Sequence, residues 1–141
     1  MTTDFTPPVT SPSIIVLTLA RQVETELNSA LAPLDLTVRK LGLLGHVAGV
    51  PGASFSDLAR MSGITVQTVH TSVKALARAG LVRDRTARAG AASTIEVTEA
   101  GAAVLADARR VVAEVDARLF GADADPVRRR VGRGIVEAFT G

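Results

Sequence analysis

The chain contains no cysteine, no tryptophan and no tyrosine. Without cysteine there are no disulfides, thiolate metal ligands, cysteine nucleophiles or thiol-based oxidant sensors. Because only four of the 141 residues are phenylalanines, the core has to be built from Leu, Val, Ala and Ile. The usual side chains for stacking on an aromatic ligand are also missing, so a ligand pocket here must rely on other contacts.

Signals for secretion and membrane insertion are also missing. Residues 1–12 are rich in Pro, Ser and Thr, lack the basic and apolar segments of a signal peptide, and read as a disordered tail. The apolar run 14–20 is far shorter than the ~20 residues that cross a bilayer. We therefore expect a cytoplasmic protein with no membrane partner.

Motifs for catalysis, metal binding and cofactor binding are absent as well. The two histidines, His46 and His70, are isolated in the sequence. We find no Ser-His-Asp set, no metal-ligand spacing and no glycine-rich phosphate loop. The sequence predicts a protein that is not an enzyme and that has no metal site and no cofactor.

Apolar residues recur at helical spacing along most of the chain, which predicts a single, mainly α domain over residues 13–141. The third helix is expected to be capped by Ser56 or a neighbour, and two β-prone segments within 81–97 predict a small hairpin. The six expected helices cover residues 13–32, 37–50, 57–61, 65–79, 98–120 and 127–139.

Segment 65–79 has one apolar face and one polar face that carries no acid. At 100° per residue, Val69, Val73 and Leu76 fall side by side, so they should point into the core. A short helix and a turn at Gly63 precede the segment, which is the layout of a helix-turn-helix. The polar side and its edges carry Gln67, Thr68, His70, Thr71, Lys74 and Arg78.

Positive charge is concentrated around this segment. Residues 54–95 carry six Lys or Arg against two Asp or Glu, whereas the parts before and after each have a net charge of −1. Either a polyanionic partner or a solvated basic face explains this pattern. In a major groove, glutamine and threonine read bases, and basic side chains contact phosphates. The predicted DNA-binding residues are Thr65, Gln67, Thr68, His70, Thr71, Lys74, Arg78, Arg85 and Arg88.

The order of these elements resembles the winged helix-turn-helix of the MarR family of transcriptional regulators. The resemblance is carried by FSDLARMSGITVQTVHTSVKALARAGLV (55–82) and IEVTEAG (95–101). It implies a DNA-binding unit at 54–97, with the hairpin as its wing, and dimerisation helices at 13–32 and 122–141. The implied function is that of a repressor that binds palindromic double-stranded DNA as a homodimer and is released by a small effector.

The wing departs from the family pattern. An Asp-x-Arg is common there, and the corresponding positions in this chain are Ala89-Gly90-Ala91. Arg85 and Arg88 are the nearest substitutes. They are interpreted either as arginines that reach the DNA or as solvated loop charges.

The resemblance also implies an effector site among helices one, two and five, where the family binds phenolic or aromatic carboxylates. Arg39 and His46 are the polar side chains expected near it. Their alternative interpretations are a surface charge for Arg39 and a packing residue for His46.

Both terminal helices are too apolar for one small subunit to bury. Residues 14–17 are apolar around the whole helix, and in the last helix apolar residues recur every four positions from Val127 to Phe139. A homodimer that pairs these helices would bury both. The remaining alternative for the whole chain is a winged-helix module that binds protein rather than DNA, which would not need an acid-free face.

Overall fold

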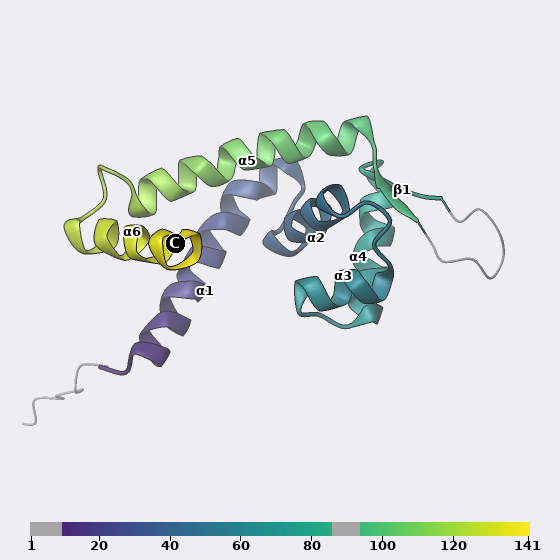
Figure 1. Ribbon diagram of the computed structural model, residues 1–141. Helices are drawn as coiled ribbons and strands as arrows, with labels where there is room; N and C mark the ends of the chain where they lie inside the picture. The colour runs from purple at the N-terminus through teal and green to yellow at the C-terminus, as the bar shows by residue number, and fades with distance from the viewer. Residues whose placement is uncertain (1–9, 86–93) are drawn as a thin grey trace, which may run out of the picture.

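The computed structural model describes residues 10–85 and 94–141. Figure 1 shows α5 running along the length of the molecule, with the hairpin at one end and α6 at the other. The six helices and the antiparallel hairpin of the predicted fold class are confirmed. The elements are α1 (Pro12–Leu31), a 3-10 turn η1 (Ala32–Leu34), α2 (Val38–Gly49), α3 (Phe55–Ser62), α4 (Val66–Arg78), β1 (Val82–Asp84), β2 (Ile95–Val97), α5 (Glu99–Phe120) and α6 (Pro126–Thr140).

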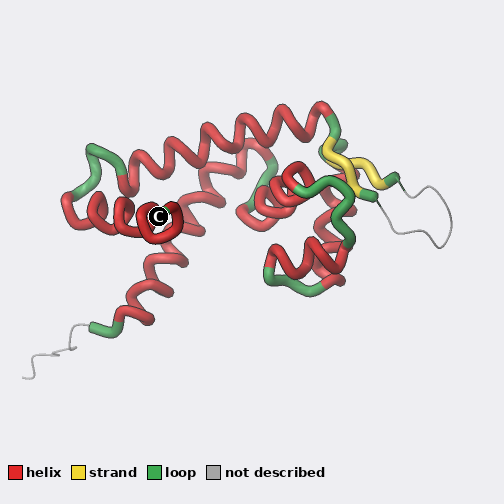
Figure 2. The backbone as a smooth tube through the Cα atoms, in the orientation of Figure 1, coloured by secondary structure: helices red, strands yellow, loops and turns green. Residues whose placement is uncertain are grey.

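The main core lies where α2, α3, α4 and the hairpin meet beneath one end of α5 (Figure 2). As expected from the scarcity of aromatic residues, its fully buried larger side chains are all Leu or Val. The buried face predicted for α4 is also correct. The most deeply buried side chains include Leu31, Leu43, Leu44, Leu58, Val69, Leu76 and Val115.

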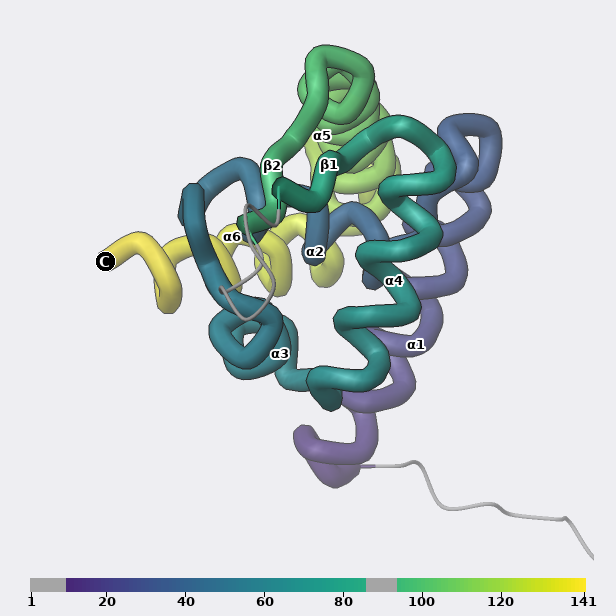
Figure 3. Tube along the Cα trace, turned by 90° about the vertical axis from the view of Figure 1, so that its right-hand side faces the viewer, coloured from purple at the N-terminus to yellow at the C-terminus, as the bar shows by residue number. Residues whose placement is uncertain are grey.

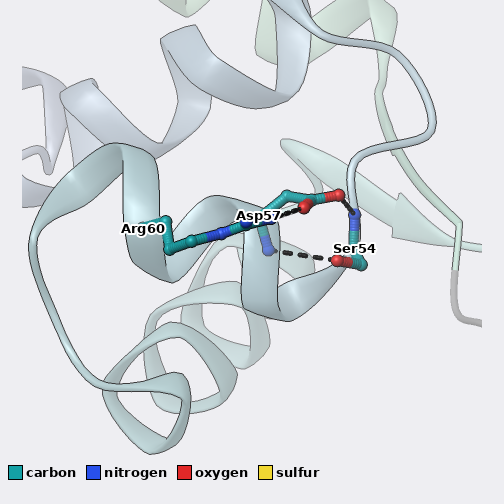
Figure 4. A network of polar contacts seen from close by, with 3 residues as sticks. All are labelled: Ser54, Asp57 and Arg60. Carbon is teal, nitrogen blue, oxygen red and sulfur yellow. Dashed lines mark hydrogen bonds and ion pairs between the residues drawn. The ribbon is translucent and has the colours of Figure 1, made fainter.

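The sequence predicted the start of α3 incorrectly. This helix begins at Phe55, two residues earlier than expected, and its cap is Ser54 rather than Ser56. The reason is a capping box. The Ser54 hydroxyl accepts from the Asp57 N–H at 3.0 Å, and the Asp57 carboxylate accepts from the Ser54 N–H at 3.1 Å (Figure 4). Together the two bonds satisfy backbone donors that the first turn leaves free.

The capping box also affects the titration of Asp57, which forms an ion pair with Arg60 on the next turn. The backbone hydrogen bond from Ser54 is the largest cause that lowers the pKa of Asp57 below its ordinary value of 3.8, with smaller contributions from the Ser54 side chain and Arg60. A lowered pKa means that the ionised form is favoured in the folded state. The stabilisation is therefore fully present above the ordinary pKa and is lost as the pH falls through the folded value.

The base of the hairpin is attached to both neighbouring helices. Gly80, at φ +76°, ends α4 in the left-handed conformation that glycine adopts easily. The Thr98 hydroxyl donates to the Gly80 carbonyl at 2.6 Å, and the Thr98 N–H donates to the Leu81 carbonyl at 3.0 Å. Thr98 also caps α5 by accepting from the Gly101 N–H. The wing, α4 and α5 therefore meet at a single junction.

The two terminal helices are poorly covered in the single chain. The N-terminal half of α1 extends past the rest of the molecule (Figures 1 and 3), and its Ile14 and Leu17 are 51% and 55% exposed. Within the described residues, α6 has no buried side chain, and Phe139 is 88% exposed. The surface apolar residues expected from the sequence are therefore present on both helices.

Candidate nucleic-acid interface

Helix α4 is fixed at both ends and along one side. Thr65 caps it by accepting from the Thr68 N–H at 3.1 Å, and Gly63, at φ +66°, makes the preceding turn. Val69, Val73 and Leu76 are buried against α3 and the rest of the core. These contacts set the rotation of the helix about its axis, so its opposite face must point to solvent.

That opposite face contains the residues expected there. The side chains of Gln67, Thr71, Lys74 and Arg78 are all exposed. The Thr71 hydroxyl donates to the Gln67 carbonyl at 3.1 Å, one turn earlier in the helix. A strip with an amide, a hydroxyl and two cations, and no carboxylate, is suited to a duplex.

Thr65 and Thr68 contribute to the N-terminal end of this surface through the cap. Their hydroxyl oxygens are 2.8 Å apart, and Thr68 is half-buried. Their first role is to hold the start of α4. Any contact that they make to a base would therefore come from hydroxyls that are already oriented.

His70 lies at the edge of the face, next to α3. Its ring stacks on Phe55, with centroids 4.0 Å apart and the ring planes at 21°. Phe55 is the first residue of α3, so the stack links the two helices of the motif. No local sequence pattern predicts this contact, because it depends on the angle between α3 and α4.

The wing contributes Arg85 at the end of β1. Its side chain is 60% exposed, and its Nε lies 3.1 Å from a Glu96 carboxylate oxygen on β2. Arg88, the other arginine expected in the wing, lies outside the described residues, as do Ala89, Gly90 and Ala91.

Arg39 and His46 line the same pocket, a cavity of 510 Å³ beside α1. Its third wall is the end of α3 and the following turn, and its lining residues include none from α5. Met61, Ser62 and Ile64 form that wall. None of these three residues was predicted from the sequence to line an effector site. The Ser62 hydroxyl oxygen is buried and has no hydrogen-bond partner among the described residues.

Two features seen elsewhere in proteins are missing from residues 10–85 and 94–141. Across these residues, no helix is both long and apolar enough to cross a bilayer. Nor do three or more His, Asp or Glu side chains come together there in a way that would hold a metal ion.

Comparison with known proteins identifies the family. Residues 34–91 match the MarR family. The chain is 32% identical over 109 residues to the HTH-type transcriptional repressor Rv2887 of Mycobacterium tuberculosis, covering 77% of this chain and 78% of that one. The chain belongs to the MarR family. Its relative is a transcriptional repressor, which is not an enzyme class.

Solved MarR structures have the same fold. The M. tuberculosis MarR family protein Rv2887 in complex with DNA has a TM-score of 0.75 and 26% identity, over 91% of this chain and 97% of that one. The same protein in complex with salicylic acid has a TM-score of 0.70 and 26% identity, over 96% and 98%. A MarR family regulator from Rhodococcus sp. RHA1 has a TM-score of 0.76 at 24% identity, over 94% and 96%.

Proposed function

We propose that this MarR protein is a repressor that binds palindromic double-stranded DNA as a homodimer and is released by a small aromatic carboxylate. The observation that carries the proposal is the exposed, acid-free face of α4, held in place by its buried opposite side. Membership of a family with a relative crystallised on DNA supports the same conclusion. A winged-helix module that binds protein rather than DNA would not need an acid-free face on α4.

On DNA, the exposed face of α4 divides into two roles. Gln67, near the N-terminus of the helix, is suited to adenine, which it can contact through two hydrogen bonds. Lys74 and Arg78 follow about two and three turns further along the helix and are suited to phosphates, which fix the register of the protein on the duplex. Thr71 lies between Gln67 and Lys74 and can contact either a base or a phosphate.

The DNA-binding proposal predicts different effects for Gln67→Ala and Lys74→Ala. Lys74→Ala should weaken binding to every duplex alike. Because one phosphate contact is lost, the negative slope of log K against log salt concentration should become smaller in magnitude by roughly 0.9. Gln67→Ala should cost about 1–3 kcal/mol on the operator and relax the preference at one base pair. The measurement is a titration of duplexes from the upstream region of the gene at several salt concentrations.

Three duplexes make that titration decisive. They are the operator, the operator with one changed pair and an unrelated sequence. Equal losses on all three for Gln67→Ala would remove its base-reading role. A folded wild-type protein that binds none of them at low salt would contradict the proposal itself.

Dimerisation is proposed from the exposed apolar surfaces of α1 and α6. A groove of 390 Å³ between the two helices is lined by Ile14, Ile15, Val127 and Val131, among others. A second copy offers the same apolar residues in return, as a two-fold interface requires. Two α4 helices about 34 Å apart would then fit successive major grooves of a palindromic site.

Release by an effector is proposed from the position of the pocket. Ile64 and Ser62 line it and come immediately before Thr65, the cap of α4. A ligand that fills this cavity pushes on the turn that sets the start of α4. Arg39 supplies a positive charge for a carboxylate, and the Ser62 hydroxyl supplies a polar group without a partner in the described structure.

Salicylate is therefore expected to release the protein from DNA, and Arg39→Ala should raise the concentration required about ten-fold or more, because a hydrogen bond to a charged group contributes about 1.5–3 kcal/mol. Arg21→Ala is the matched control, since Arg21 is exposed on α1 and does not line the pocket. The readout is the salicylate concentration at half-release of a labelled operator. Equal shifts for the two variants would rule out the role of Arg39.

A further inference from the structure

The outer face of the wing carries an ordered set of charges. In the β1–β2 register, Arg83 lies opposite Glu96, and Asp84 lies opposite Ile95. Side chains alternate between the two faces of a strand, so the buried Val82 and Ile95 define the inner face. Arg83, Arg85 and Glu96 therefore share the outer face, where one carboxylate lies between two arginines.

Arg85 is held on this face by two contacts. Its N–H donates to the Thr94 carbonyl at 2.7 Å, which continues the strand pairing one residue past β1. Its side chain crosses the hairpin diagonally and places Nε 3.1 Å from a Glu96 oxygen. Contact through Nε leaves the two terminal nitrogens of the guanidinium in position for a second acceptor.

The pair contributes little to the stability of the fold. The side chains of Arg85 and Glu96 are 60% and 43% exposed, and an ion pair so open to water is screened. What it changes is the freedom of the arginine, a long side chain that otherwise loses conformational entropy on binding. The Arg85–Glu96 ion pair therefore matters for binding rather than for the stability of the fold.

We propose that Glu96 is a positioning residue, which holds the guanidinium of Arg85 in the orientation that contacts a DNA phosphate beside the major groove. The proposal rests on the proposed DNA-binding function. The expected effect of Glu96 on DNA affinity is opposite to that of an ordinary acid on a DNA-binding surface. An acid on a DNA-facing surface repels phosphate, yet this acid strengthens binding because it orders the cation beside it.

A double-mutant cycle of Glu96 and Arg85 measures whether Glu96 raises or lowers the affinity for DNA. Glu96→Ala should weaken operator binding about three- to ten-fold, the range expected when an ordered side chain becomes free. In an Arg85→Ala background the same change should strengthen binding, because only the repulsion remains to be removed. Glu99→Ala is the matched control. It also removes one exposed negative charge near the wing, and it should strengthen binding slightly in both backgrounds.

The possible results distinguish a positioning role of Glu96 from a purely repelling one. If Glu96→Ala strengthens binding in the wild-type background, as Glu99→Ala does, Glu96 acts only as a repelling charge and the proposal is wrong. The proposal is also wrong if the losses in DNA-binding free energy for Glu96→Ala and Arg85→Ala simply add in the double variant. Unchanged thermal unfolding of each variant verifies that the hairpin still folds. A wild-type protein that binds no duplex would count against the proposed function, before Glu96 is tested at all.

Discussion

Ile135→Glu is expected to separate the protein into monomers and to abolish tight operator binding. Ile135 is 50% exposed on α6, in the apolar series that we assign to the dimer interface. An uncompensated charge in a buried interface costs about 3–5 kcal/mol, and two-fold symmetry introduces it twice. The dimer dissociation constant should therefore rise at least roughly 100-fold. Light scattering and sedimentation at micromolar concentration measure the change in mass.

Two further variants at this position control for the sign of the charge and for the mere presence of a substitution. Ile135→Lys should dissociate the dimer as strongly as Ile135→Glu, since either charge is unpaired there. Ile135→Leu keeps the apolar surface and should remain a dimer. If only the glutamate variant loses DNA binding while both stay paired, the effect is electrostatic and α6 is not the interface. Monomeric wild-type protein would contradict the dimer outright.

Gly101→Ala is expected to destabilise the whole DNA-binding unit. A Cβ at Gly101 would overlap the backbone carbonyl oxygen of Leu81 and would lie 2.8 Å from Val97 Cγ1. The backbone cannot move aside cheaply, because Leu81 also accepts a hydrogen bond from Thr98. We expect a loss near the top of the range for overpacking, about 3 kcal/mol, which lowers the melting temperature by roughly 6–12 °C.

Gly45→Ala in α2 is the matched control for this prediction. A Cβ there meets nothing within 4 Å, so the change should stabilise the protein by about 0.5–1 kcal/mol through the better helix propensity of alanine. Thermal and urea unfolding compare the two variants. Equal stability of Gly101→Ala and wild type would mean that α5 and the base of the wing are not in tight contact.

The sequence predicted the exposed face of α4 well because a single periodicity determines it. Val69, Val73 and Leu76 bury one side, and the polar side follows from the geometry of a helix. Gly80 was predicted as the residue just past the end of α4, since a C-terminal cap acts within one turn. Thr65 was taken as the first residue of this helix, whereas it is the N-cap. The start of α3 was readable too. Ser54 and Asp57 have capping-box spacing, and that signal was missed in favour of Ser56.

Other features depend on how distant segments meet, and no local pattern encodes that. The pocket wall at Met61 and Ser62 exists because the α3–α4 turn packs beside α1 and α2. Arg85 and Glu96 are paired by the hairpin register, and residues 86–93 contain no Asn-Gly or Asp-Gly turn that would fix the register in advance. The stack of His70 on Phe55 requires the crossing angle of two helices.

The uninterrupted course of α5 has a consequence for how such a repressor can change its target. Its 22 residues form a rod about 33 Å long, which joins the wing at one end to the region of α6 at the other (Figure 1). Inserting one residue would turn one end about 100° relative to the other. The length of α5 therefore sets the distance between the two halves of the DNA site, and α5 can change length only by nearly whole helical turns. The base preference, in contrast, can change by substitution of one α4 side chain at a time.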